Sequence, residues 1–311
     1  MSPAPVRELH ACERVLSLGG PGAAPALMGV LNATPDSFSD VPEERGVGAR
    51  VARAHALLAA GARIIDVGGE SNVTNRPAVG AAEEIERVVP LVERVRALRD
   101  HVTVSIDTYK PEVAQAAVDA GASIVNDISG LADPRLADVC ARTGAALIVM
   151  HTRAAPKRKV LEPELYDDVM ADVLAFLRER IDLAVARGVR PEQILVDPGP
   201  DFAKTPAQTV EVLGRLDELH ALERPVLLAI SRKDAIGAIT RRGPRDRLAG
   251  TLAALADGAD RGAHVARVHD VRDAADFLAV RSALRGETDV GRDLQLPDEL
   301  RRLTPSDAAD G

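Results

Sequence analysis

The sequence has 311 residues, of which 46% are hydrophobic and only 2% aromatic, so its large core must be built from aliphatic side chains. The formal net charge is −8 and basic residues are scattered, which excludes a general attraction to nucleic acid or to anionic membranes. Two cysteines without metal or redox spacing, and no apolar run near about 18 residues, predict a cytoplasmic protein without a signal peptide or membrane span.

The two ends of the chain differ from its middle. Residues 1–26 are rich in Pro, Gly and Ala, and we predict a loose lead-in there with one short strand near Val15–Leu18. Residues 286–311 are polar, and we expect a mobile, disordered tail. The folded domain is therefore expected to span residues 27–285.

Between these ends, short and almost continuously apolar runs alternate with longer amphipathic ones. Such runs are typical of strands that are covered on both faces, as in a parallel sheet. The predicted strands are Leu27–Leu31, Ile64–Val67, Val102–Ile106, Ile124–Ile128, Ala146–Met150, Ile194–Val196, Val226–Ile230 and Val265–Val268.

The segments that follow the strands show helical spacing of apolar residues. The predicted helices are Val51–Leu58, Ala82–Leu98, Pro111–Ala120, Pro134–Arg142, Tyr166–Ala186, Ala207–Leu219, Asp246–Asp260 and Val271–Leu284. Eight strand and helix pairs in one run favour a single-domain α/β fold, the (β/α)₈ TIM barrel. A doubly wound open sheet is the alternative.

Polar residues follow the predicted strands at the point where each strand ends. In a barrel these ends meet at one face, where catalytic groups gather. Helix capping explains a polar residue at one position of a connection, but not the same class of residue at every strand end. The strand ends carry Asn32, Asp66, Asp107, Asn126, Asp127, His151, Asp197, Ser231 to Lys233, His269 and Asp270.

One group of these residues predicts a heterocyclic substrate. The group combines carboxylates, an amide and an ammonium, which suits a ring with N–H donors beside a carbonyl, as in a pterin or purine. It consists of Asp107, Asn126, Asp197 and Lys233.

A second group suits a polyphosphate that carries Mg²⁺. It consists of Asn32, Arg267 and His269, together with the hydroxyl-rich loop that begins at Thr34. Mg²⁺ keeps several waters and needs few protein ligands, so Asn32 is the predicted metal contact. Zinc is not expected, because the sequence has no His pair at helical spacing and no Cys cluster.

Seven segments resemble, in order and spacing, the motifs of the dihydropteroate synthase family. They are Met28–Asp40, Asp66–Ser71, Ser105–Pro111, Asn126-Asp127, Asp197–Lys204, Ser231–Lys233 and Arg267–Asp270. The resemblance implies a transferase of folate biosynthesis. Such an enzyme joins 6-hydroxymethyl-7,8-dihydropterin diphosphate to 4-aminobenzoate and releases pyrophosphate.

The resemblance also implies roles for the matching residues. On the pterin side the residues are Asp107, Asn126, Asp197 and Lys233, with Asp107, Asp197 and Lys233 as the catalytic set. Asn32 would contact Mg²⁺, while Arg267 and His269 would bind the diphosphate. The implied displacement is dissociative, so carboxylates would stabilise the pterin cation and the neutral amine would need no strong base.

On the acceptor side, Arg76 and Phe202 would border the aminobenzoate, and Thr34 would belong to a lid over the reacting methylene. Asp234 would lie at a helix N-terminus that receives the aminobenzoate carboxylate. The resemblance further implies a homodimer formed through barrel helices.

The departures from the family pattern gather on this side. The loop Asn72–Ala78 is longer than usual and lacks a Gly, Val41-Pro42 replaces two glycines, and Pro200-Asp201 precedes Phe202. Asp234 replaces the usual Ser or Arg. It either caps the helix or repels an anionic acceptor.

Three hypotheses follow from these observations. The first is a dihydropteroate synthase with a remodelled acceptor loop. The second is a synthase-like paralogue that uses another amine or has no synthase activity. The third is a pterin-binding domain that presents a folate to a methyltransferase partner.

Overall fold

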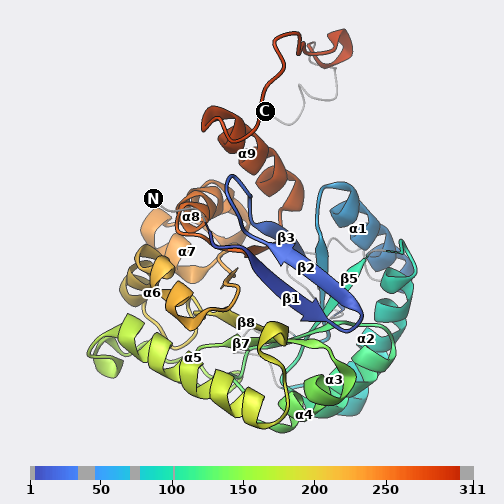
Figure 1. Ribbon diagram of the computed structural model, residues 1–311, viewed down its shortest axis with the longest axis vertical. Coiled ribbons are helices and arrows are strands. Elements are labelled where there is room, and N and C mark those ends of the chain that lie inside the picture. Colours follow the sequence, from blue (N-terminus) through green and yellow to red (C-terminus); the bar gives the residue numbers. More distant parts are fainter. Residues whose placement is uncertain (1–3, 34–45, 71–77, 101, 302–311) are drawn as a thin grey trace.

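The computed structural model describes residues 4–33, 46–70, 78–100 and 102–301, and its centre is a parallel barrel inside a ring of helices (Figure 1). The eight strands are β3 (Ala26–Asn32), β4 (Ile64–Gly68), β5 (Thr103–Asp107), β6 (Ile124–Asp127), β7 (Ala146–Met150), β8 (Ile194–Asp197), β9 (Leu227–Leu228) and β10 (Val265–Val268). They pair in parallel in the order β8-β7-β6-β5-β4-β3-β10-β9. A parallel bridge between Val196 and Val226 closes the ring. The predicted barrel is confirmed, and the open-sheet alternative is wrong.

Helices connect the strands on the outside of the barrel. They are α1 (Val47–Ala59), α2 (Ala81–Arg96), α3 (Pro111–Asp119), α4 (Arg135–Thr143), α5 (Val169–Ala186), α6 (Pro206–Gly214), α7 (Asp234–Thr240), α8 (Leu248–Asp260) and α9 (Val271–Leu284), with 3₁₀ turns at Pro163–Leu165, Pro191–Gln193, Leu216–Leu222, Pro244–Asp246 and Asp298–Leu300. The predicted helix Ala207–Leu219 is divided, because α6 ends at Gly214 before a 3₁₀ turn. Helix α7 is absent from the predicted set because its seven residues are too few for a clear period.

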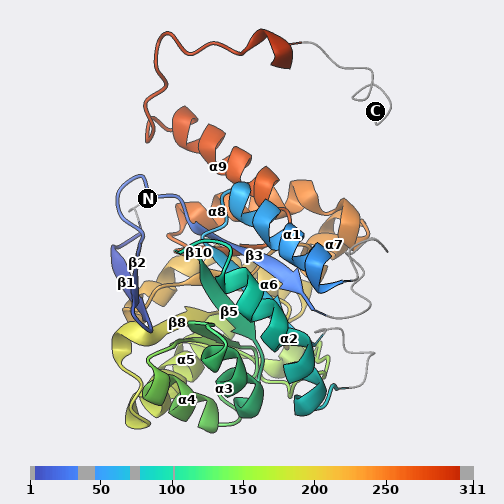
Figure 2. The ribbon, with the colours of Figure 1, turned by 90° about the vertical axis from the view of Figure 1, so that its right-hand side faces the viewer.

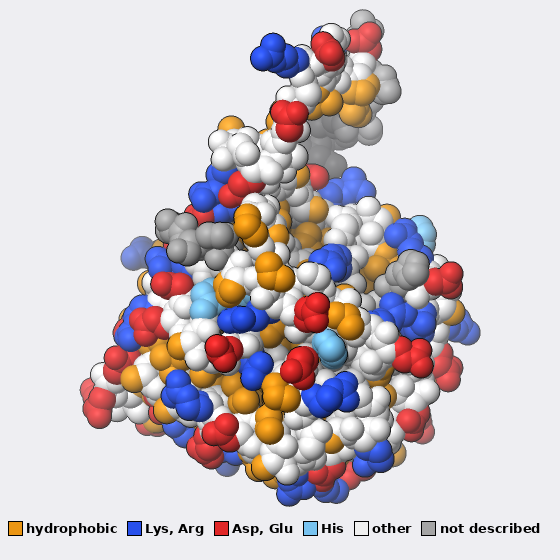
Figure 3. All heavy atoms as spheres, viewed as in Figure 1, with side chains coloured by type: hydrophobic (Ala, Val, Ile, Leu, Met, Phe, Trp, Pro, Cys, Tyr) orange, Lys and Arg blue, Asp and Glu red, His pale blue; other side chains and the backbone are white. Residues whose placement is uncertain are grey.

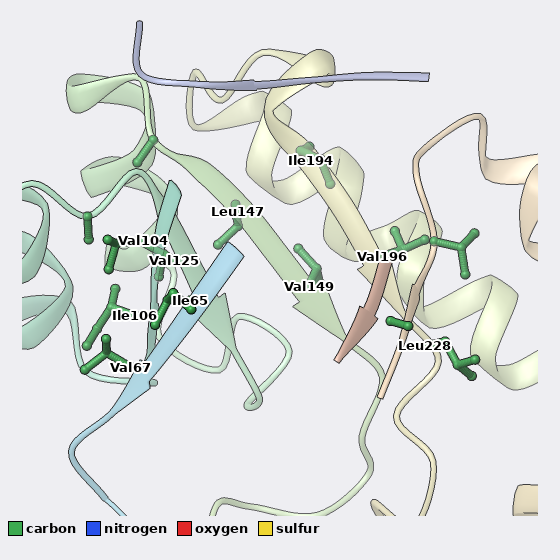
Figure 4. Close-up of a cluster of buried hydrophobic side chains, with 14 of the residues drawn as sticks. Ile65, Val67, Val104, Ile106, Val125, Leu147, Val149, Ile194, Val196 and Leu228 are labelled. Carbon is green, nitrogen blue, oxygen red and sulfur yellow. The ribbon is translucent and has the colours of Figure 1, made fainter. Parts of the chain in front are cut away.

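Two apolar cores cover the two faces of the sheet. The outer core packs strand side chains such as Ile65 and Val67 against the helices (Figure 4). The inner core fills the barrel with side chains that include Met28, Ile64 and Leu195. Because both faces are covered, the strand sequences are almost continuously apolar.

An antiparallel hairpin, β1 (Arg7–Ala11) and β2 (Arg14–Leu18), lies across the base of the barrel, where the parallel strands begin (Figures 1 and 2). The buried side chains of Leu9 and Leu18 join the inner core. The short strand expected near Val15–Leu18 is confirmed by β2, whereas the expectation of a loose lead-in is wrong for β1. Their apolar side chains are few and alternate with charged ones, and only the finished barrel supplies the surface that buries them.

The surface of the molecule shows no segregation of charge on the hairpin face, where acidic and basic side chains are mixed (Figure 3). None of the helices in the described ranges is long and apolar enough to cross a membrane. After α9 the chain leaves the barrel, is exposed over residues 284–298, and forms one short turn at Asp298–Leu300 (Figure 2). The expected disorder beyond residue 301 lies outside the described residues.

The hairpin contributes to stability through its buried face, and a pair of substitutions tests this. Leu9 is 0% exposed in the inner core, so Leu9→Ala should lower the free energy of unfolding by about 2–5 kcal/mol in urea titrations. Val15 on the neighbouring strand is 55% exposed, and Val15→Ala should change the free energy of unfolding by less than about 0.5 kcal/mol. Equal effects of the two substitutions would contradict a packed hairpin.

Candidate active site

The carboxyl ends of the parallel strands form the mouth of the barrel, and strand register places polar residues side by side there. Asn32 pairs with Gly68, and Gly68 pairs with Asp107. Asp107 pairs in turn with Asn126. The Asn32 Oδ1 and Asp107 Oδ2 atoms lie 3.8 and 3.9 Å from the point where a Gly68 side chain would begin. The glycine therefore leaves the space between the two polar groups open.

Arg267 reaches from β10 to two carboxylates on β4 and β5. Its Nε donates to Asp66 Oδ2 at 2.6 Å, and its Nη2 donates to Asp107 Oδ2 at 2.8 Å. Asn126 Nδ2 donates to the same Asp66 oxygen at 3.2 Å. Burial alone would lower the pKa of Arg267, but Asp66 and Asp107 outweigh it and raise the pKa. The guanidinium is thus a fixed positive charge inside the mouth.

Two buried oxygen atoms beside this ion pair have no hydrogen-bond partner among the described residues. They are Asp66 Oδ1 and Ser105 Oγ, on residues that pair between β4 and β5. Both residues are 0% exposed. Leaving a buried polar atom without a partner costs about 1–3 kcal/mol. These atoms therefore indicate a place for a polar ligand or an ordered water.

The wall formed by β8 and the segment after β9 presents a carboxylate, an ammonium and an aromatic ring. Asp197 Oδ1 accepts a hydrogen bond from Gly199 N–H at 2.7 Å. Burial raises the pKa of Asp197, although Lys233 opposes the shift. Burial lowers the pKa of Lys233, and the charges of Asp201 and Asp197 oppose that shift. The Lys233 Nζ atom lies 4.5 Å from the centre of the Phe202 ring.

His269 lies at the mouth just after β10. Its Nδ1 is 3.0 Å from Ser231 Oγ, and its backbone N–H donates to the same oxygen at 3.2 Å. Burial, followed by the charges of Arg267 and Arg232, lowers the pKa of His269 to about 3. Arg232 is itself paired with Asp270 at 2.6 Å. The imidazole is therefore neutral at pH 7 until an anion binds beside it.

The mouth offers a metal ion the amide oxygen of Asn32 with the Asp107 carboxylate beside it. Asn32 contributes one amide oxygen at the end of β3, next to Asp107 across Gly68. In the part of the chain that the structure describes, no group of three or more His, Cys, Asp or Glu side chains could hold a metal. This donor set fits Mg²⁺ that takes its other ligands from water and a diphosphate, because Mg²⁺ needs no protein cage.

Asp234 begins helix α7, but another residue caps that helix. Asp201 Oδ2 accepts from the Asp234 N–H at 2.5 Å, and Asp201 Oδ1 accepts from the Ala235 N–H at 3.2 Å. The Asp234 side chain is 62% exposed and pairs with Lys159 and Arg247, each at 3.1 Å. Of the two alternatives for Asp234, the helix cap is therefore wrong, because Asp201 accepts from these N–H groups.

Comparisons with known proteins agree on one family. The pterin binding enzyme family matches residues 28–269. The dihydropteroate synthases of Escherichia coli (strain K12) and Bacillus subtilis (strain 168) are each 40% identical over 259 residues, which are 83% of this chain and 91% and 88% of the relatives. This chain belongs to the dihydropteroate synthase family.

The solved structures of the family agree with this assignment. Xanthomonas albilineans dihydropteroate synthase with 4-aminobenzoic acid matches with a TM-score of 0.81 and 39% identity, over 90% of this chain and 99% of that chain. Yersinia pestis dihydropteroate synthase with a sulfonamide drug complex matches with a TM-score of 0.82 and 37% identity, over 90% of this chain and 100% of that chain.

The residues predicted for a dihydropteroate synthase site fall into three groups in the structure. The first group gathers at the mouth and consists of Asn32, Asp107, Asn126, Asp197, Phe202, Lys233, Arg267 and His269. Asp234 lies exposed at the start of α7. Thr34 and Arg76 lie outside the described residues, as do Val41-Pro42 and positions 72–77 of the second loop.

Three residues that the structure places in the site have no role predicted from the sequence. The role of Asp66 could have been predicted, because a carboxylate inside an apolar strand requires a buried partner. The role of Ser105 is harder to predict, since Ser is tolerated in a buried strand. The role of Asp201 has no sequence feature that predicts it, because its capping contact joins it to the N–H of a residue 33 positions later.

The ion pair at the mouth can be tested through stability. Asp66→Ala leaves Arg267 with one buried carboxylate fewer, so the free energy of unfolding should fall by about 3–5 kcal/mol in urea. Asp257→Ala removes an exposed i,i+4 pair with Arg261 and should cost less than about 1 kcal/mol. An Asp66→Ala protein as stable as its parent would show that Asp66 does not hold Arg267.

Proposed function

We infer that this chain, a transferase of its family, catalyses the dihydropteroate synthase reaction of folate biosynthesis. Its substrates are 6-hydroxymethyl-7,8-dihydropterin diphosphate and 4-aminobenzoate. The observation that carries the inference is the mouth of the barrel, where Arg267 bridges Asp66 and Asp107 beside unpartnered buried oxygens. Related proteins support it, since Xanthomonas albilineans dihydropteroate synthase was solved with 4-aminobenzoic acid and with 7,8-dihydropteroate.

The pterin ring has complementary partners on two sides of the mouth. We assign Asp107 and Asn126 to one edge of the ring, on adjacent strands β5 and β6. Asp197 and Lys233 serve it from the other wall. Carboxylates accept from the ring N–H groups, and the amide and ammonium donate to its carbonyl and ring nitrogen. All of these groups are largely shielded from water, which strengthens each hydrogen bond.

The diphosphate lies against Arg267, His269 and Asn32. Arg267 supplies a fixed positive charge, and the neutral His269 supplies a hydrogen-bond donor whose pKa rises when the anion arrives. Asn32 is the protein contact for Mg²⁺, which when bound neutralises charge on the leaving pyrophosphate. These assignments place the leaving group on the β3 and β10 side of the mouth.

The reaction exchanges one bond for another at the pterin methylene. The C–O bond to the diphosphate breaks and its electron pair leaves with pyrophosphate. The amine nitrogen of 4-aminobenzoate then forms a C–N bond and releases one proton to solvent. Asp107 and Asp197 stabilise the positive charge that develops on the pterin. The arylamine attacks as the neutral form, so no residue has to act as a strong base.

The acceptor enters at the rim beside Phe202. That ring lies against the Lys233 ammonium, so both groups can contact a flat anionic arene. We keep Thr34 and Arg76 as acceptor contacts from the first and second loops. Asp234 is tied to cations of other segments, so its charge opposes an anionic acceptor less than the sequence alone suggests.

One observation favours a second function, a synthase-like enzyme with another acceptor amine. The Asp201 carboxylate already accepts from two N–H groups at the start of α7. An acceptor carboxylate that needs these groups must displace Asp201. An uncharged amine would avoid this competition.

We also propose that the protein works as a homodimer in the cytoplasm. The family resemblance supports the dimer. Both cysteines, Cys12 and Cys140, are free thiols, which suits a reducing compartment.

The proposed reaction is tested with purified protein and both substrates. Pyrophosphate and dihydropteroate should form in equal amounts, and chelation of Mg²⁺ should stop the reaction reversibly. Asp107→Asn should lower kcat by about 10²-fold or more, because it removes a carboxylate that stabilises the developing cation. Pyrophosphate without dihydropteroate would favour a changed acceptor. Pterin binding without either product would favour a folate-binding partner of a methyltransferase.

The position of the acceptor carboxylate is tested at Asp201. Asp201→Ala frees the α7 N–H groups and removes a negative charge, so the KM for 4-aminobenzoate should fall by about threefold to tenfold in initial-rate measurements. Asp168→Ala is the matched control, because Asp168 caps α5 through two N–H groups in the same way. Both variants should lose about 1 kcal/mol of stability. An unchanged KM in Asp201→Ala would place the acceptor carboxylate elsewhere.

A further inference from the structure

We propose that Lys204, held by His151 and Asp172, is a positioning residue for residues 198–204, which we call the acceptor loop. This loop follows Asp197 and carries Phe202, so the proposal rests on the proposed function. Lys204 does not reach the substrates in this account. It acts through the backbone of the loop and so determines how tightly 4-aminobenzoate binds.

The Lys204 ammonium uses all of its donors inside the protein. Its Nζ donates to the carbonyl oxygens of Gly199 and Phe202 at 3.0 and 3.2 Å. The third contact is His151 Nδ1 at 2.7 Å. Lys204 is only 1% exposed, so no water competes for these bonds. A lysine buried to this extent is uncommon unless it has a complete set of partners.

Asp172 determines which way the proton of His151 points. His151 Nε2 lies 2.8 Å from Asp172 Oδ2, and Arg153 holds the same carboxylate through contacts at 3.0 and 2.6 Å. A carboxylate can only accept, so His151 carries its proton on Nε2 and leaves Nδ1 as an acceptor. Lys204 must then donate to Nδ1. The two hydrogen bonds therefore have fixed directions: Lys204 donates to His151, and His151 donates to Asp172.

The acceptor loop has a backbone that needs such support. Gly199, Asp201 and Ala203 all have positive φ angles, of 64°, 67° and 51°. Non-glycine residues in this region cost about 1 kcal/mol or more each. Tyr166 adds a further contact, because its hydroxyl donates to the Ala203 carbonyl at 2.9 Å. The side chains of Lys204 and Tyr166 thus hold three of its carbonyl groups.

The shape that results places Phe202 over the Lys233 ammonium. Losing the Lys204 contacts would release this ring. Asp201 would stay in place, because Thr209 and the N–H groups at the start of α7 hold it independently of Lys204.

Among the pterin contacts, Asp107 and Asn126 belong to other strands and do not depend on this loop. Asp197 depends on it in part, because it accepts from the Gly199 N–H.

The proton on Lys204 matters because a neutral amine has only two N–H groups. Burial lowers the pKa of Lys204 to about 7, while Asp197 is the main group that opposes the shift. Ionisable groups facing this network are His151, Arg153, Tyr166, Asp172, Asp197, Asp201 and Lys233. His151 has a pKa of about 3, so it stays neutral. Above neutral pH, Lys204 therefore loses one of its three hydrogen bonds, and the acceptor loop is held less firmly.

The main test is Lys204→Met, which keeps the length of the side chain and removes its donors. The KM for 4-aminobenzoate should rise about tenfold, while the KM for the pterin diphosphate should rise by a clearly smaller factor, because Asp107 and Asn126 keep their places. Amide hydrogens of residues 198–204 should also exchange faster with deuterated water. This second readout does not depend on activity, so failure of the proposed function and failure of this inference are distinguishable.

Gln193→Met is the matched control. Gln193 is 0% exposed, and its Nε2 donates to two carbonyls, of Cys140 and Ala145, at 3.1 and 2.7 Å. It lies at the other end of β8. Its loss should lower stability but leave both KM values and the exchange of the acceptor loop unchanged. Equal changes in both KM values of Lys204→Met, or no change in either, would overturn the inference.

Two further measurements decide the matter if Lys204→Met does not fold. The parent enzyme should show a several-fold rise in the KM for 4-aminobenzoate from about pH 6 to about pH 9, with a smaller rise in the KM for the pterin diphosphate. Lys204→Arg keeps its charge and should flatten this profile. A flat profile in the parent enzyme, or the same slope in Lys204→Arg, would contradict the role of Lys204.

Discussion

The contacts of Arg267 with Asp66 and Asp107 are the interaction on which the mouth of the barrel depends. They cross the interior from β10 to β4 and β5, where an unpaired charge would cost several kcal/mol. Asp66 still has a buried oxygen atom without a partner among the described residues. The site therefore exists before any ligand arrives, with its charges already placed.

The barrel separates stability from chemistry along each strand. In β3, Met28 belongs to the inner core near the base, and Asn32 lies four residues later at the mouth on the same face. In β4, Ile64 and Gly68 show the same division. The apolar layers hold the strands in register, and that register sets the distances between polar groups at the mouth. Substitutions in the inner core can therefore change the site without touching it.

The sequence was sufficient for the barrel and for most of its polar mouth, because both depend on local patterns. A buried parallel strand has to be apolar, and its end has to be polar where it meets a ligand. The first strand of the hairpin was missed because Leu9 is buried only by the finished barrel. The cap of α7 was missed because a distant residue, Asp201, outcompetes the local Asp234. Contacts within and between loops, such as those of Lys204, produce no periodic pattern of residues, so the sequence does not predict them.

The hairpin across the base also limits where ligands can enter and leave the barrel. It joins the inner core and closes the end of the barrel where the strands begin, so substrates enter and products leave through the mouth. The proposed pterin groups lie on the strand ends, and the proposed acceptor groups lie on the loops above them. A ligand that fills the outer position stands in the path to the inner one. On the proposed assignments, two molecules that share one entrance bind with the pterin first, because an acceptor already in the outer position would close the way to the inner one.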